Sequence, residues 1–203
     1  MHTIQRIFFW IVLVFLPCTA AAAAADPQAL FDSAGAAFNE GRYDRAIKEF
    51  SSLLSLVPDV ADAYYYRGLS YYRTGRYDEA IEDFTKAASL YPQPHDAELY
   101  HNRGLAYFKK GDYPRAIEDD TRALSLKPDY VEAYHNRGVA RSRRGNYDEA
   151  IEDFNKAISL KPSHAEAYFS RGFAYVQKAA ADFQRVCDMG NQKACDNLKQ
   201  LAQ

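Results

Sequence analysis

The chain has 203 residues with 25 basic and 27 acidic side chains, which gives a formal net charge of −2. Because proteins bind the nucleic acid backbone through a surplus of Lys and Arg, this balance argues against a nucleic acid partner. A hydrophobic content of 48% with 26% charged residues is typical of a folded protein with a water-facing surface.

The first 25 residues have the pattern of a secretory signal peptide. Arg6 precedes an apolar run, 7–16, and a tract of alanines then ends at Ala25. The run of about ten residues is shorter than the roughly 20 that a membrane-spanning helix needs. We expect cleavage after Ala25 and a bacterial protein that is periplasmic or secreted, without membrane insertion after cleavage. The alternatives are an uncleaved anchor and a lipid on Cys18, although Pro17 stands where a lipoprotein signal needs a small residue.

One pattern of glycines, alanines, aromatic residues and a closing proline recurs four times from residue 27 to residue 164. Ala46 and Ala80 are 34 positions apart, as are Ala116 and Ala150. The interval from Ala80 to Ala116 is 36, which places two extra residues near Gln93. The clearest copy contains Tyr64, Gly68, Tyr71, Gly75, Tyr77, Ala80, Phe84, Ala87 and Pro92.

Each copy is predicted to form two helices that pack closely. Gly68 and Ala80 lack side-chain bulk where the helices would meet, and Tyr71 and Phe84 fill the remaining volume at helical spacing. Gly75 is suited to end the first helix. Because one such pair cannot bury its apolar face alone, neighbouring pairs must stack.

Two sets of charged residues are predicted to pair. Arg67, Arg103 and Arg137 each precede an aspartate by sixteen positions, and we expect an ion pair between the two helices of each unit. The aspartates are Asp83, Asp119 and Asp153. Asp120 and Arg141 stand where other copies have aromatic residues, so we expect them to form an ion pair across a repeat boundary. The alternative is that both reach solvent.

The 34-residue pattern resembles the tetratricopeptide repeat (TPR) family. The resemblance implies an all-α fold, a TPR α-solenoid in which antiparallel helix pairs form a right-handed superhelix. The expected units are a signal peptide at 1–25, a divergent first repeat at 27–60, repeats at 61–94, 97–130 and 131–164, and a degenerate fifth repeat with capping helices at 165–203.

The fifth unit keeps the first-helix pattern from Tyr168 to Tyr175 but lacks the turn that should follow. Tyr175 and Phe183 are 8 positions apart, whereas Tyr71 and Phe84 are 13 apart, so five residues are missing. The apolar residues continue at helical spacing through the gap. This predicts a single long helix at 165–188 that caps the stack, followed by a short helix at 192–201.

The segment from Cys187 to Cys195 resembles the Sel1-like repeats, relatives of the TPR. In cysteine-rich members of that family, two cysteines eight apart tie one helix to the next. The resemblance implies a disulfide between Cys187 and Cys195, which an oxidising compartment would preserve. Free thiols and a functional pair are the alternatives, but the spacing is not Cys-x-x-Cys and a structural zinc site needs four ligands.

The TPR resemblance also implies that the first helices line a concave groove that binds a partner. One row of groove positions holds Tyr65, His101, His135 and Phe169. A second row holds Tyr72 and Phe108, with Ser142 in place of the aromatic residue, and a basic row beside it holds Arg73, Lys109 and Arg143. Flat rings flanked by cations suit a peptide or helix with apolar and acidic residues. The alternative is that these residues merely suit a partly buried helix.

These patterns favour a non-catalytic scaffold or adaptor that binds a protein or peptide in its groove. No enzymatic motif, cofactor motif or metal-ligand spacing is found, and His101 and His135 are expected about 10 Å apart, too far to share a metal ion. The His row also has no Lys for the carboxylate clamp of chaperone-binding TPR domains. The alternative function is a self-associating component of an envelope assembly, a homo-oligomer built through the less protected N-terminal unit.

Overall fold

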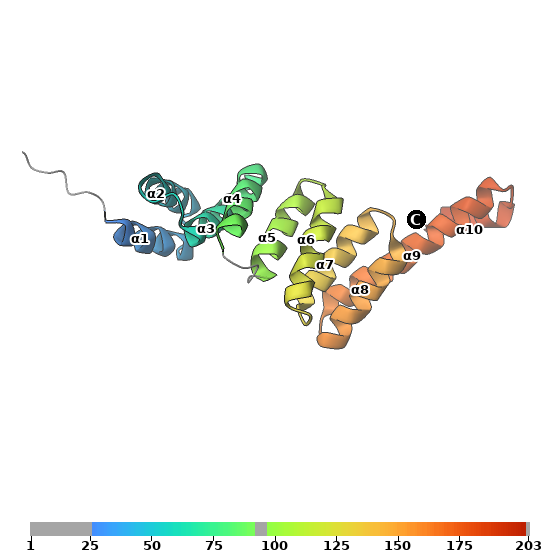
Figure 1. The fold of residues 1–203 in the computed structure, drawn as a ribbon. Coiled ribbons are helices and arrows are strands. Elements are labelled where there is room, and N and C mark those ends of the chain that lie inside the picture. The colour runs from blue at the N-terminus through green and yellow to red at the C-terminus, as the bar shows by residue number, and fades with distance from the viewer. Residues whose placement is uncertain (1–25, 92–96, 202–203) are drawn as a thin grey trace, which may run out of the picture.

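The structure, a computed structural model, describes residues 26–91 and 97–201, and all regular structure in these ranges is helical. Figure 1 shows the helices folding back on one another along one elongated stack. They are α1 (Pro27–Asn39), α2 (Tyr43–Leu56), α3 (Ala61–Arg73), α4 (Tyr77–Leu90), α5 (Ala97–Lys109), α6 (Tyr113–Leu126), α7 (Val131–Arg143), α8 (Tyr147–Leu160), α9 (Ala165–Asp188) and α10 (Gln192–Leu201). The predicted signal peptide and the insertion near Gln93 lie outside the described residues.

The turns between paired helices depend on glycine. Gly75 joins α3 to α4 with a φ of 80°, and Gly145 joins α7 to α8 with a φ of 82°. Only glycine adopts this left-handed conformation without a steric penalty from Cβ. The backbone N–H of Arg76 then donates to the carbonyl of Tyr71 at 2.9 Å, which satisfies an acceptor at the end of α3. The glycine predicted to end the first helix therefore does so.

A second set of glycines allows the two helices of a unit to touch. A Cβ added to Gly68 would lie 3.0 Å from the ring of Phe84, and one added to Gly138 would lie 2.7 Å from the ring of Phe154. Both rings are fully buried. The absence of a side chain on the glycine thus allows the phenylalanine ring to pack directly against the backbone of the facing helix.

An arginine fork holds each of the three regular units together. Arg67 donates from Nε and Nη2 to both carboxylate oxygens of Asp83, each at 2.7 Å. Arg103 binds Asp119 in the same way at 2.8 and 2.7 Å, and Arg137 binds Asp153 at 3.0 and 2.7 Å. The predicted pairing between the two helices of each unit is confirmed.

The predicted ion pair between Asp120 and Arg141 is wrong. Arg141 Nη1 lies 2.8 Å from a carboxylate oxygen of Asp153, so it joins the fork of its own unit. Asp120 turns instead toward His101, whose Nδ1 lies 2.7 Å from its Oδ1. Arg141 thus finds a carboxylate within its own unit, and Asp120 finds a histidine on the facing helix of its unit. Neither side chain needs a contact across the repeat boundary.

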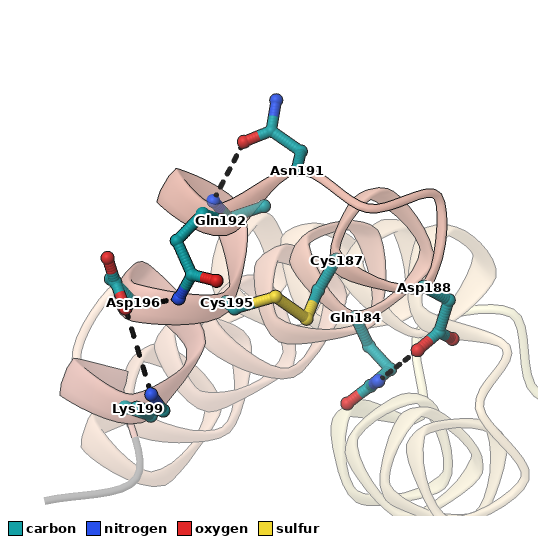
Figure 2. Close-up of a disulfide and its surroundings, with 9 residues drawn as sticks. Gln184, Cys187, Asp188, Asn191, Gln192, Cys195, Asp196 and Lys199 are labelled. Carbon is teal, nitrogen blue, oxygen red and sulfur yellow. Dashed lines mark hydrogen bonds and ion pairs between the residues drawn. A yellow bond between two sulfur atoms is a disulfide. The ribbon is translucent and has the colours of Figure 1, made fainter.

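The C-terminal region confirms the predicted long helix. α9 runs without interruption from Ala165 to Asp188, and α10 folds back onto its second half. In Figure 1 the second half of α9 and α10 extend beyond the last regular pair. Figure 2 shows the turn between them, where the Sγ atoms of Cys187 and Cys195 lie at disulfide-bond distance, 1.97 Å. Among the described helices, none combines the length and the hydropathy that crossing a bilayer demands.

Candidate functional site

Successive first helices lie side by side, α3 on α5, α5 on α7 and α7 on α9. We call the surface formed by these four helices the groove face. A side chain from each helix reaches the next: Asn102 Nδ2 donates to Tyr65 Oη at 3.0 Å, and His135 Nε2 lies 3.1 Å from Ser170 Oγ. Asn136 Nδ2 and His101 Nε2 lie 3.4 Å apart at the equivalent place. This first row therefore connects neighbouring units.

His101 is a core residue, which corrects its expected place on the groove surface. Its exposed fraction is 5%, and its ring lies 4.9 Å from that of Tyr130 in addition to the Asp120 contact. The buried carboxylate explains the difference, because Asp120 occupies the position of Phe84 and Phe154 and needs a polar partner. His101 thus offers almost no surface to a ligand.

His135 and Tyr65 are half-buried and also pack inward. The ring of His135 lies 5.8 Å from Phe154, and that of Tyr65 lies 5.9 Å from Phe84. Burial, with a smaller contribution from the neighbouring His164, lowers the pKa of His135 below its usual value, which favours the neutral ring. Phe169, the last member of the row, is 77% exposed.

The second row changes character along the groove face. The ring of Tyr72 lies 5.6 Å from Tyr77, and that of Phe108 lies 5.3 Å from Tyr113. Both are half-buried, and burial raises the pKa of Tyr72. Each ring thus packs on the first residue of the second helix of its own unit.

At the equivalent position of α7, Ser142 supplies no ring. A cavity of about 330 Å³ lies among α7, α8 and α9, lined by Val139, Ser142, Arg143, Phe154, Phe169, Ser170 and Phe173. Ser142 Oγ is buried and has no hydrogen-bond partner among the described residues. The site thus combines apolar rings with an unsatisfied polar atom, as ligand sites commonly do.

The basic row remains unpaired at the ends of α3, α5 and α7. Arg73, Lys109 and Arg143 are exposed and form no ion pair or hydrogen bond within the part of the chain that the structure describes. Neighbouring cations behave differently: Lys110 contacts Asp78 and Lys178 contacts Asp148. Three free cations along one edge favour a ligand that carries negative charge.

Nothing in the described ranges points to a metal centre, because no three His, Cys, Asp or Glu side chains gather closely enough to hold an ion. The predicted site residues thus divide into three groups. In the first row, Tyr65, His101 and His135 connect neighbouring units. In the second row, Tyr72 and Phe108 pack within their own units. The remaining residues are exposed: Arg73, Lys109, Arg143 and Phe169. The structure brings Arg143 and Phe169 together at the cavity.

Comparison with known proteins agrees with this architecture. A family model described as a tetratricopeptide repeat matches residues 19–61 and 31–94, and a second, described as a TPR repeat, matches 104–143 and 141–178. The chain belongs to the tetratricopeptide repeat family. The Sel1-like resemblance of the C-terminal cysteines stays a prediction. No curated protein sequence matches the chain.

Several solved TPR structures resemble the chain. A crystal structure of MamA is 28% identical with a TM-score of 0.71, and the match covers 86% of this chain and 89% of that one. YrrB, described as a TPR protein with an unusual peptide-binding site, is 26% identical with a TM-score of 0.68, covering 75% and 78%. The second TPR domain of human RPAP3, in complex with an HSP70 peptide, is 31% identical with a TM-score of 0.54, covering 57% and 94%.

The cavity itself was not predicted, although its cause is visible in the sequence. The exchange of an aromatic residue for Ser142 at a repeat position indicates missing volume. The sequence does not say whether neighbouring side chains close that volume. In the structure the volume stays open, and Phe169 and Phe173, which line it, are both exposed.

Proposed function

We propose that this TPR protein is a non-catalytic scaffold whose groove face binds a segment of a partner protein. A large apolar side chain of the partner occupies the cavity at Ser142. Acidic residues of the same segment then meet Arg143, and the basic row of Arg73 and Lys109 extends the attraction along the groove face. Such a ligand has one buried apolar side chain surrounded by charged contacts. Protein interfaces commonly gain most of their binding energy from a few buried residues inside a polar rim.

The observation that carries this proposal is the replacement of a ring by Ser142. The row supplies its own ring at Tyr72 and at Phe108, and each ring packs on a tyrosine of the following helix. At Ser142 the row has no ring, and a cavity lies there with two exposed phenylalanines in its lining. A side chain from another protein can complete the packing and gain the free energy of leaving water.

Related TPR structures support a peptide or protein as the ligand class. YrrB is described by its peptide-binding site, and the RPAP3 domain was solved with an HSP70 peptide. This chain has no lysine in the row of His101 and His135, so the proposed recognition uses the side-chain cavity, not a terminal carboxylate. The acidic preference comes instead from the free cations at the groove edge.

We further propose that the protein acts outside the reducing cytoplasm. The pattern of residues 1–25 supports export, and the close approach of Cys187 and Cys195 supports a compartment in which a disulfide persists. Under this proposal the mature chain begins near Asp26 and meets its partner in the periplasm or beyond.

The ligand class is tested by selection from a displayed library of random peptides. Wild type is compared with Ser142→Phe, which fills the cavity, and with Ser159→Phe, which adds the same ring at an exposed position on α8. We expect wild type and Ser159→Phe to enrich peptides with one large apolar residue near Asp or Glu, and Ser142→Phe to lose them. Enrichment of the same peptides by all three proteins would place binding elsewhere and overturn the proposal.

The charge component has its own variant. Arg143→Glu reverses one cation at the cavity rim and leaves the cavity walls in place. We expect peptides selected on this variant to keep the apolar anchor but to lose the neighbouring acidic residues. An unchanged acidic preference would show that the basic row does not contact the ligand.

A further inference from the structure

The first half of α9 presents a helix-packing face that no second helix covers. Gly172 stands where Gly68 and Gly138 stand in their units. A Cβ added to either of those glycines would meet a buried phenylalanine, but one added to Gly172 would meet nothing within 4 Å. Beside it, Tyr168 and Tyr175 are 46% and 52% exposed. The surface that should receive a second helix is therefore open.

The second half of α9 has the sequence of that missing helix. Ala179 and Phe183 repeat the four-residue interval of Ala80 and Phe84, and Asp182 precedes Phe183 as Asp83 precedes Phe84. The unit thus contains both of its helices, but the five residues of the turn are absent. Both halves consequently form one continuous helix, and neither can fold back on the other.

Arg171 shows what the open face lacks. In each regular unit the arginine contacts the preceding unit through Nη1 and its own aspartate through Nε and Nη2. Arg171 keeps the contact to the preceding unit, because its Nη1 donates to Asn155 Oδ1 at 2.5 Å. Its guanidinium also lies 5.2 Å from the centre of the Tyr168 ring, and the arginines of the regular units contact the equivalent tyrosines in the same way. The structure gives its Nε and Nη2 no carboxylate.

Asp182, the aspartate that corresponds to Asp83, is on the same helix and cannot reach Arg171. The two residues are eleven positions apart, which separates them by about 16 Å at 1.5 Å per residue. Asp182 is exposed, and its one ion pair in the described chain is a contact of 3.9 Å to Arg185. Both members of the repeated fork are present and both lack their repeat partner.

We propose that two copies of the chain pair through α9 in antiparallel orientation, each first half receiving the second half of the other. Arg171 of one copy then binds Asp182 of the second, and the same contact forms again around the two-fold axis. Phe183 of the second copy occupies the space over Gly172. The arrangement is a domain swap of the fifth unit, and shortening a hinge is a recognised route to such dimers.

The occupant is a second copy because the two halves of α9 complement each other in charge and in shape. The face with Arg171 and Gly172 matches a helix with Asp182 and Phe183, and the chain carries that helix itself. α10 packs on the second half of α9, where the first helix of a following unit would lie, so it accompanies the exchanged segment. The pairing is closed, since each copy uses its two halves once. It differs from the self-association through the N-terminal unit that is the alternative function expected from the sequence.

The mass of the protein in solution tests the pairing without any peptide ligand. Residues 26–203, which include every described helix, are measured by light scattering after size exclusion. We expect wild type to have the mass of two chains. Arg171→Asp and Asp182→Arg, each alone, place like charges at both symmetric contacts and are expected to be monomers with unchanged circular dichroism. Lys48→Asp reverses an exposed charge on α2, outside the proposed contact, and is the control that remains dimeric.

Mixing the two single variants gives the most discriminating test. One copy of Arg171→Asp and one of Asp182→Arg regain opposite charges at both contacts, so the mixture is expected to form a heterodimer. Inserting Gly-Arg-Tyr-Asp-Glu between Lys178 and Ala179 restores the missing turn and is expected to give a monomer, because the hairpin then closes within one chain. A monomeric wild type, dimers that ignore the charge changes, or a mixture that stays monomeric would each overturn the proposal.

Discussion

His101 Nδ1 lies 2.7 Å from a carboxylate oxygen of Asp120, and the two side chains are only 7% and 3% exposed. Asp120 holds the position that the buried Phe50, Phe84 and Phe154 occupy in other units. Burial raises the pKa of Asp120 to about 6, and the contact with His101 opposes this rise only in part. The pair is therefore a polar insertion in an otherwise aromatic core.

Replacing Asp120 by Phe together with His101 by Tyr, the residues found at the Phe84 and Tyr65 positions, is expected to stabilise the protein at neutral pH by about 1 kcal/mol, because a buried polar pair gives way to packed rings. The stability that Asp120 contributes is present below its unfolded pKa near 4 and is lost as pH rises through its folded pKa near 6. The advantage of the variant should accordingly grow from pH 4 to pH 7, which urea unfolding at several pH values measures. A variant less stable than wild type at pH 7 contradicts this account.

Removing Arg103 should cost more than removing Arg103 and Asp119 together. The carboxylate of Asp119 is buried, and burial raises its pKa even with the arginine fork in place. Arg103→Ala leaves that charge without its partner and is expected to lower the free energy of unfolding by about 2 kcal/mol. The double variant, with Asp119→Ala, should recover part of the loss. Equal or greater loss in the double variant, measured by urea unfolding, would show that the fork contributes net stability.

Ser142→Phe is expected to raise the free energy of unfolding by about 1 kcal/mol. The ring fills the cavity and removes a buried hydroxyl that has no partner. Thermal unfolding against Ser159→Phe as control measures the change. A gain in stability joined to a loss of peptide binding is the signature of a position kept open for a ligand. Destabilisation would mean that the cavity is too small for a ring.

The bond between Cys187 and Cys195 should stabilise α10 locally. Closing a loop across eight positions is worth about 2 to 3 kcal/mol in the chain-entropy model. Cys187→Ser with Cys195→Ser is expected to speed hydrogen exchange in α10 and leave α3 to α8 unchanged. Intact mass before and after alkylation shows whether the bond is present in protein from the oxidising compartment. Equal exchange rates in α10 would indicate that packing alone holds the helix.

Repetition made most of the fold predictable. The turn glycine Gly75, the fork of Arg67 and Asp83, and the continuous course of α9 each follow from a spacing that recurs or fails to recur along the sequence. Such features depend on local backbone geometry and on one neighbouring helix. A pattern of positions is sufficient to specify them.

Features that depend on competition among several partners were not predictable. Arg141 is predicted to pair with Asp120 of the preceding unit. In the structure it binds Asp153 of its own unit instead. His101 was assigned to the groove surface because its position faces that side in the repeat, but the buried Asp120 drew it inward. The cavity at Ser142 depends likewise on how Phe169 and Phe173 settle at the end of the stack. Side-chain packing, not spacing, decides these outcomes.

The central claim, that an apolar side chain of a partner occupies the space at Ser142, is tested most directly by a double-mutant cycle on binding. One selected peptide and its anchor→Ala analogue are titrated by calorimetry against wild type and Ser142→Phe. Burying a large apolar side chain is worth about 1.5 to 3 kcal/mol, so each single change should weaken binding by roughly 10- to 100-fold. If the anchor lies in the cavity, the two changes together should weaken binding little further than either alone. Losses that multiply independently would place the anchor elsewhere and contradict the account.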